Sequence, residues 1–320
     1  DVGNGGVGGC QNIALSGLDY QQIDAAVQAL PDNCFTFFSM FPGGFTPNFG
    51  GNITDTSLAV GTKGEFKNGF ASGIMYDFSG VVGRSESTFQ LFNSVNASLG
   101  PETPTDFEAG RYIQLEKTFS ADFVKFVPAG LYEDLTVAFG TQWTEESFEI
   151  VAGEQASWEV GPYVDQGLSN GSNGFPGFQP QTAGTSTRRN YAAYVDVEAE
   201  FTENLLGALA VRFEDYDSFG TTTNYKLTGQ YRLSDDWALR ASTSTGFRAP
   251  TVGQANVSNV RTELNQGVLV DVGVLPPTNP VAILKGATEL EPEESTSYAF
   301  GVVFGGVDVV NHSRQSSGFT

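Results

Sequence analysis

Residues 190–201 read NYAAYVDVEAEF, and the alternation within this stretch decides the fold class. Apolar side chains stand at the odd positions, and mostly charged side chains stand between them. The apolar set is Tyr191, Ala193, Val195, Val197, Ala199 and Phe201, and the opposite set is Tyr194, Asp196, Glu198 and Glu200. Because successive side chains of a β-strand point to opposite faces of the sheet, the pattern predicts a strand with one apolar and one polar face.

The same period of two continues through residues 205–216, 224–233 and 237–247. One face is predicted to carry Leu209, Val211, Leu227, Tyr231 and Leu239, and the other Arg212, Lys226, Gln230, Arg232 and Arg240. Further strands are predicted at 55–66, 70–83, 111–127, 135–150, 189–201 and 295–304, with a candidate at 307–311. The sequence therefore predicts an all-β chain of about ten antiparallel strands.

The connections between the predicted strands alternate in length. The short ones are 67–69, 128–134, 202–204, 234–236 and 305–306, and the mostly long ones are 84–110, 151–188, 217–223 and 248–294. Short turns at one end and long loops at the other are typical of an outer-membrane β-barrel, in which the short turns are periplasmic. Several strands also reach the roughly 9 to 11 tilted residues that cross the hydrocarbon layer.

Aromatic residues recur near the ends of the predicted strands. In a membrane barrel they would form the interfacial girdles, and the candidates are Tyr191, Phe201, Phe213, Tyr225, Trp237 and Phe247. A soluble antiparallel sheet with one buried face shows the same alternation, and there the same aromatics would form the core. Periodicity alone leaves both interpretations open.

The charge balance is strongly acidic. The chain of 320 residues has 37 acidic and 16 basic side chains, a formal net charge of -21. Nucleic-acid binding is therefore disfavoured, because phosphate contacts need a basic face. An acidic surface could attract cationic or metal-chelate ligands, but a solvated or salt-adapted surface is the favoured interpretation.

The sequence shows neither a membrane-spanning helix nor a signal peptide. No run approaches the roughly 18 apolar residues of a membrane helix. The start, DVGNGGVGG, is not a signal peptide, which leaves either a cytoplasmic protein or a piece of a longer precursor.

The two cysteines, Cys10 and Cys34, lie in a region rich in glycine and phenylalanine, without CxxC spacing or a nearby histidine. A disulfide between them in an oxidising compartment is favoured over two free thiols. Closing this loop would remove about 3 kcal/mol of unfolded-chain entropy in the simple loop model. The single histidine, His312, has no partners for a catalytic triad or a metal site, so neither is predicted.

Residues 245–254 read TGFRAPTVGQ and mark the abrupt end of an alternating strand. Pro250 ends the ladder because it lacks an N–H donor and fixes its own φ. Phe247 is predicted at the outer interface and Arg248 at the extracellular rim. The chain should then enter a long loop, 251–294, whose VLPPTNP stretch is expected to be extended, and return at LEPEES.

Together these stretches resemble the barrel of the outer-membrane TonB-dependent receptors. The resemblance rests on YRLSDDWALRASTSTGFRAPTVGQ followed by LEPEESTSYAFGVVF, and upstream segments in the same order extend it over most of the chain. Its most specific part joins Gly246, Phe247, Arg248, Ala249 and Pro250 to Leu290, Pro292, Glu293 and Ser295.

The resemblance implies a receptor in the outer membrane of a Gram-negative bacterium, which binds a scarce or large substrate and imports it with TonB-transduced energy. Such receptors enclose a plug domain in a barrel of about 22 strands. Residues 1–311 would be part of that barrel, without the plug, and 312–320 an irregular tail. The implied partners are outer-membrane lipid, the TonB complex acting through the plug, and an iron–siderophore, cobalamin or oligosaccharide substrate. No enzyme activity and no cofactor are implied.

One predicted extracellular loop, SWEVGPYVDQGLSNGSNGFPGFQP, combines aromatic residues with glycines. Its rings could form a ligand-binding platform, because aromatics supply contact area at low entropic cost. The candidates are Trp158, Tyr163, Phe175 and Phe178. The alternative is that these rings pack the loop against itself.

Two other functional classes stay open at the level of sequence. A passive porin would show the same lipid-facing alternation, although the paired GFRAP and LEPEES stretches disfavour it. A secreted β-sandwich that binds carbohydrate would bury the apolar face and behave as a monodisperse protein without detergent.

Overall fold

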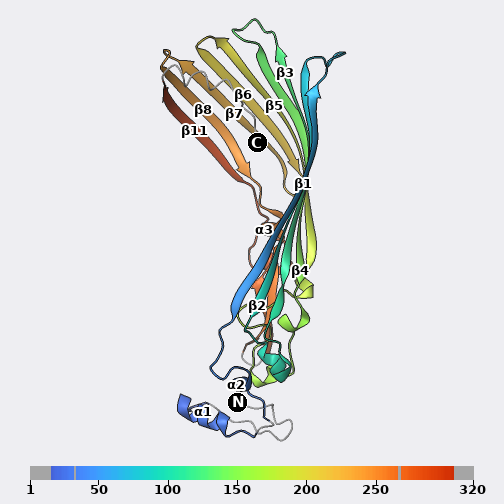
Figure 1. Ribbon diagram of the computed structural model, residues 1–320, viewed down its shortest axis with the longest axis vertical. Coiled ribbons are helices and arrows are strands. Elements are labelled where there is room, and N and C mark those ends of the chain that lie inside the picture. Colours follow the sequence, from blue (N-terminus) through green and yellow to red (C-terminus); the bar gives the residue numbers. More distant parts are fainter. Residues whose placement is uncertain (1–15, 32–33, 266–267, 306–320) are drawn as a thin grey trace.

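The computed structural model describes residues 16–31, 34–265 and 268–305, and within them nine strands form one open antiparallel sheet (Figure 1). The order in the sheet is β1-β2-β3-β4-β5-β6-β7-β8-β11, so neighbours in the chain are neighbours in space until β8. The strands are β1 Asn48–Glu65, β2 Ile74–Phe92, β3 Phe107–Val127, β4 Leu135–Ala152, β5 Gly184–Thr202, β6 Leu205–Tyr216, β7 Gly220–Arg232, β8 Trp237–Arg248 and β11 Glu293–Phe304. The predicted all-β architecture, a partial antiparallel barrel, is confirmed.

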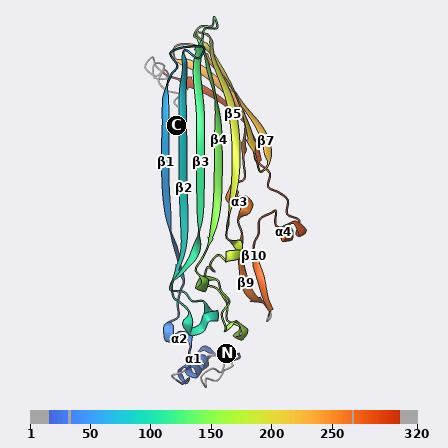
Figure 2. The ribbon, with the colours of Figure 1, turned by 90° about the vertical axis from the view of Figure 1, so that its right-hand side faces the viewer.

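The short turns gather at one end of the sheet and the long connections at the other (Figures 1 and 2). Beyond the long-loop end lie the helices α1, Tyr20–Gln28, and α2, Phe37–Met40. One connection at this end is shorter than predicted: β6 and β7 are joined by residues 217–219, because Gly220 takes a positive φ of 89° and β7 starts there.

The nine strands differ in length. Strands β1–β5 have 18 to 21 residues, whereas β6, β7, β8 and β11 have 12 or 13. About 9 to 11 tilted residues suffice to cross a bilayer. The first five strands therefore continue well past that length at the long-loop end.

The predicted division of side chains between two faces is confirmed by the strand register. Val197 pairs with Leu209, Leu209 with Leu227, and Tyr231 with Leu239, and direct partners share a face. On the other face Asp196 pairs with Ala210 and Ala210 with Lys226. Val195, Leu209, Leu227, Tyr231 and Leu239 are 42 to 51% exposed, so the apolar set, here called the outer face, is uncovered.

The predicted loop 251–294 has structure of its own. It contains the helix α3, Val252–Asn256, a hairpin of β9, Asn259–Asn265, with β10, Val268–Val274, and the helix α4, Pro280–Leu284. The expectation that VLPPTNP is extended is wrong beyond its start: Asn279 caps α4 and Pro280 opens it, because proline is preorganised for a first helical turn. Within the described residues, the helices are all too short or too polar to cross a bilayer.

Two of the long connections fold into a small core of their own at the long-loop end. They contain four 3₁₀ turns: η2 Ala97–Glu102, η3 Gln155–Ser157, η4 Val164–Gln166 and η5 Pro180–Thr182. Leu91, Phe107 and Ala109 are buried there against Phe89, Ala156 and Phe175. Among the described residues, no second layer covers the outer face of the sheet.

Candidate functional site

The inner face at the long-loop end carries a cluster of aromatic rings. The aromatic cluster comprises Phe49, Phe89, Tyr112, Phe148, Phe175 and Phe178. Tyr112 and Phe178 stack at 4.8 Å between ring centroids, and Tyr112 lies 5.1 Å from Phe148. Strands β1 to β4 supply four of the rings and the connection 153–183 supplies two, so the cluster holds that connection against the sheet.

The four predicted platform residues lie in different environments. Phe175 and Phe178 belong to the aromatic cluster, and Phe178 is 1% exposed, so its ring offers no surface to a ligand in this conformation. The indole Nε1 of Trp158 donates to the Gly153 carbonyl at 3.1 Å. The ring of Tyr163 lies against Gly100, where an added Cβ would stand 2.5 Å from it. Each ring thus has a packing role, and no ring contact joins Trp158 or Tyr163 to the cluster in the part of the chain described.

Asn96 organises the two connections that the aromatic cluster holds. Its amide Nδ2 donates to the carbonyls of Ala156 and Glu159, at 2.9 and 3.0 Å, and its Oδ1 accepts from the Ser98 hydroxyl at 2.7 Å. The side chain is fully buried. One asparagine therefore joins residues 93–106 to residues 153–183, using both its donor and its acceptor group.

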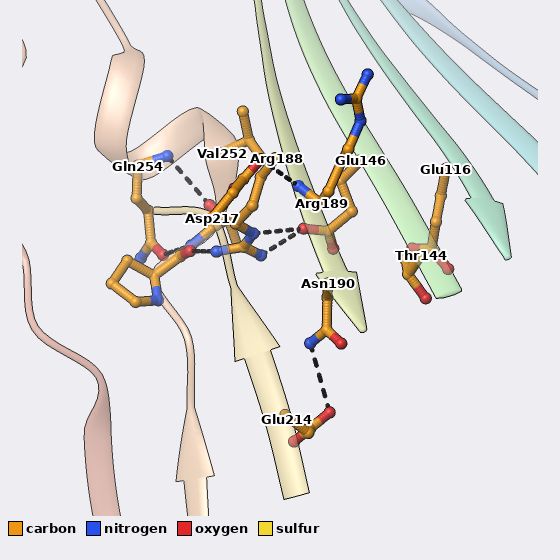
Figure 3. A network of polar contacts seen from close by, with 12 residues as sticks. Glu116, Thr144, Glu146, Arg188, Arg189, Asn190, Glu214, Asp217, Val252 and Gln254 are labelled. Carbon is orange, nitrogen blue, oxygen red and sulfur yellow. Dashed lines mark hydrogen bonds and ion pairs between the residues drawn. The ribbon is translucent and has the colours of Figure 1, made fainter. Parts of the chain in front are cut away.

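Next to the aromatic cluster, the inner face becomes polar, and Arg188 on β5 is central to it (Figure 3). The Arg188 guanidinium donates to the Glu146 carboxylate on β4, through Nε at 3.0 Å and also through Nη2. Its Nη1 donates to the carbonyl of Pro250, in the segment that follows β8. The guanidinium also stands 5.3 Å from the centroid of the Tyr216 ring on β6. Arg188 is 8% exposed.

The polar network continues along the inner face toward the short-turn end. Arg212 donates through Nη2 to Gln142 at 2.7 Å and to Glu214 at 3.0 Å. Farther along, the Tyr194 hydroxyl donates to Asp122 at 2.7 Å. A cavity of about 130 Å³ opens beside this network, lined by Gln142, Thr144, Glu146, Arg188, Asn190, Glu214 and Tyr216. The inner face is thus hydrogen-bonded and charged, as a surface in contact with water requires.

The outer face has two contrasting rows, one next to the other along the strands. Phe119, Trp143 and Tyr191 are direct partners across β3, β4 and β5. Two residues farther toward the long-loop end, Glu145 accepts from Lys117 and from Arg189, each at 2.9 Å. An aromatic row next to a row of ion pairs is the arrangement expected where a membrane meets water.

Five of the six predicted girdle aromatics are exposed on the sheet, namely Tyr191, Phe201, Phe213, Tyr225 and Trp237. Phe247 is the exception. Its ring meets Tyr216 edge to face at 5.8 Å, and Tyr216 belongs to the inner-face network. Phe247 is also the direct partner of Glu294 on β11, at the end of β8 that no longer pairs with β7, and its place at the outer interface stays a prediction.

The two halves of the most specific stretch are brought together as a strand pair. Arg248 pairs with Glu293 and Gly246 with Ser295, whose hydroxyl donates to the Gly246 carbonyl at 3.3 Å. β8 ends at Arg248, as the proline predicts, and Ala249 and Pro250 lead to α3. Leu290 and Pro292 precede β11.

Two predicted features lie partly or wholly outside the described residues. Cys34 is disulfide-bonded. Cys10 lies outside the described residues, so its bridge to Cys34 stays a prediction. The candidate strand 307–311 and the tail 312–320 also lie outside them.

Sequence reasoning missed Arg188, Glu146 and Asn96. A signal for the first two existed: two consecutive arginines, at 188 and 189, face two consecutive glutamates, at 145 and 146, in adjacent predicted strands. Strand partners of opposite charge on both faces predict ion pairs on both faces. Asn96 had no such signal, because its partners are backbone carbonyls far along the chain.

Comparisons with known proteins agree with this geometry. A family model described as "TonB dependent receptor-like, beta-barrel" matches residues 14–313. The search of curated proteins found no match. Among solved structures, the siderophore receptor PirA from Acinetobacter baumannii is 14% identical over 80% of this chain and 33% of its own, with a TM-score of 0.52.

Two further solved structures are similar. A ferric enterobactin receptor, PfeA from Pseudomonas aeruginosa, is 14% identical over 80% of this chain and 33% of its own, with a TM-score of 0.51. The RagAB peptide transporter is 15% identical over 81% of this chain and 29% of that chain, with a TM-score of 0.50. The chain spans about a third of the length of these proteins, and identities this low show a shared fold alone.

Proposed function

The chain belongs to the TonB-dependent receptor family, and we propose that it forms part of the wall of a receptor that imports a scarce or large substrate across the outer membrane of a Gram-negative bacterium. Members of this family are transport receptors. The imported class is proposed to be an iron–siderophore, cobalamin or oligosaccharide, and the energy to come from the TonB complex acting through a plug domain.

The observation that carries the proposal is the contrast between the two faces of the sheet. The outer face is apolar and uncovered at Leu209, Leu227 and Leu239, whereas the inner face holds the Arg188 and Arg212 networks. A soluble sandwich would cover its apolar face with a second layer, but lipid covers that of a membrane barrel. This favours a wall with lipid on one side and a watery lumen on the other.

The outer aromatic row supports a position for the membrane boundary. We place the outer interface at Phe119, Trp143 and Tyr191, with the ion pairs of Glu145 just outside it. The aromatic cluster and the two packed connections then stand outside the membrane, where a substrate arrives. Within that region the exposed parts of Trp158, Tyr163 and Phe175 are the proposed ligand contacts, with Phe178 supporting them from below.

Uptake by cells that produce the receptor from its complete coding sequence tests the proposal. Radiolabelled ferric siderophores, cobalamin and oligosaccharides would be offered to a strain without its own receptors. We expect one class to accumulate, and we expect the accumulation to stop when TonB is deleted or the proton gradient is collapsed. Uptake that persists in both cases would show a passive porin instead, and a protein that stays monodisperse without detergent would show a soluble one.

A further inference from the structure

The segment that follows β8 does not leave the barrel for solvent. Residues 249–257, here called the strap, turn back across the inner face, and α3 lies beside β4 and β5 (Figure 2). Val252 is 7% exposed, and a Cβ added to Gly253 would stand 3.4 Å from the Phe148 ring. The strap therefore occupies the boundary between the aromatic cluster and the polar network.

The strap is a preformed unit. The Thr251 hydroxyl accepts from the Gln254 amide at 3.1 Å, and the Gln254 side chain accepts from the Thr251 amide at 2.8 Å, which closes a capping box. Asn256 donates through Nδ2 to the Val252 carbonyl at 2.9 Å. None of these bonds depends on a partner in the wall.

The contact between the strap and the wall is incomplete. An open pocket of about 360 Å³ remains between them, lined by Tyr112 and Phe148 on the wall and by Val252 and Val257 on the strap. Within the described residues, the Arg188 bond to Pro250 is the hydrogen bond that ties the strap to the inner face (Figure 3).

We propose that the strap closes the inner face between the aromatic cluster and the polar network, and that Arg188 is the positioning residue that latches it. Glu146 and the Tyr216 ring hold the guanidinium so that Nη1 meets the Pro250 carbonyl. When that bond breaks, the strap swings away as a unit and opens the way along the inner face. This inference goes beyond the proposed function, because it concerns an opening step and names no substrate.

Thiol reactivity of a strap residue measures the opening. In the full receptor in intact cells, Val252→Cys would be exposed to a membrane-impermeant maleimide and its labelling rate recorded. Residue 252 is reached from solvent when the strap lifts, so the parent Val252→Cys protein should label slowly. Adding Arg188→Ala should raise the rate about tenfold or more, the factor that corresponds to losing one charged hydrogen bond.

Two matched variants complete the test. Arg189→Ala removes the neighbouring arginine, which pairs with Glu145 on the outer face, and should leave the labelling rate at position 252 within about twofold of the parent. Arg188→Lys keeps a positive charge for Glu146 but loses the forked geometry of the guanidinium, so it should also raise the labelling rate. It tests the latch even if Arg188→Ala does not fold.

An unchanged labelling rate in folded Arg188→Ala or Arg188→Lys would overturn the proposal, and so would an equal increase in Arg189→Ala. Folding of each variant is checked by its resistance to unfolding in cold detergent. Thr187→Cys, at an exposed position on β5, should label fast in every background and reports access of the reagent. The measurement needs no substrate, so its failure is distinct from failure of the proposed import.

Discussion

Arg188 and Arg189 are adjacent in β5, yet their guanidinium groups bind carboxylates on opposite faces of the sheet. Arg188 pairs with Glu146 on the inner face, and Arg189 pairs with Glu145 on the outer face at 2.9 Å. The period of two in a strand makes this division unavoidable once the register is set. The same four residues thus support a latch on one side and an interfacial ion-pair row on the other.

The outer face should reject charge that the inner face accepts. Leu227→Arg places a guanidinium beside Leu209 in the apolar band and is expected to cost about 2 to 4 kcal/mol if the site lies near the bilayer midplane. Thr228→Arg, one residue away on the inner face, is the matched control and should fold normally. Yields of heat-modifiable protein in the outer membrane give the comparison. Equal yields for both variants would contradict a lipid-facing outer surface.

Gly110 is needed at the β-bulge that seats the aromatic cluster. Its φ is +118°, and an added Cβ would lie 2.6 Å from the Phe178 ring and 2.7 Å from the Val151 carbonyl. Gly110→Ala should destabilise the protein by about 1 to 3 kcal/mol, the usual cost of a strained backbone. Gly83→Ala on β2 has no atom within 4 Å of its Cβ and should be tolerated. Chemical unfolding in detergent measures both.

Asn96→Ala should loosen the two packed connections without disturbing the sheet. The substitution leaves the Ala156 and Glu159 carbonyls and the Ser98 hydroxyl without their buried partner, at about 2 to 4 kcal/mol in total. Hydrogen exchange followed by mass spectrometry should speed up in residues 93–106 and 153–183 and stay unchanged in β6 and β7. Asn68→Ala, in the exposed turn between β1 and β2, is the control.

Acid should weaken the outer ion-pair row. Hydrogen bonds from Lys117 and Arg189 lower the pKa of Glu145 below its ordinary value. A group with a lowered folded pKa stabilises the fold above its unfolded pKa, near 4.3, and that contribution is lost as the pH falls through the folded pKa. Glu145→Gln should therefore flatten the acid side of the stability profile, measured by detergent unfolding from pH 7 to pH 3. Lys117→Ala and Arg189→Ala should each flatten it in part.

The 320-residue chain should not transport on its own. In the described part of the chain the sheet is open, and β1 and β11 are its edges, where unpaired backbone groups would each cost several kcal/mol in lipid. The chain expressed alone should aggregate or require detergent, and it should not restore uptake to a receptor-deficient cell. Stable insertion with energised uptake would refute this prediction.

The strands that cross the proposed membrane were predictable because lipid on one side and water on the other impose a strict alternation. This holds for residues 205–216 and 237–247, which match β6 and β8 closely, and for 189–201, which lie within the longer β5. The same rule fails where both faces meet water. Residues 48–54 and 84–92 extend β1 and β2. There Ser85 lies between Asp55 and Gln114 on one face and Thr88 between Asn52 and Arg111 on the other, which leaves no periodic signal.

The candidate site was less predictable, because it depends on contacts between distant segments. That Phe178 would be buried against Tyr112 follows from how the connection 153–183 folds onto β3, not from its composition. The strap is a similar case: Pro250 correctly predicted the end of β8, but not that its carbonyl would reach Arg188, 62 residues earlier in the chain. Local sequence rules predict where the strands end, whereas the fold of the segments that follow them depends on tertiary contacts.

The difference in strand length gives this part of the wall a stepped rim. β1 to β5 exceed β6, β7, β8 and β11 by at least five residues, or roughly 17 Å of strand. The pair Phe148–Ser186 lies beyond the pair Asn190–Tyr216, at which β6 ends. The helix α3, whose Gly253 stands against Phe148, therefore packs on a part of the wall that the shorter strands do not reach.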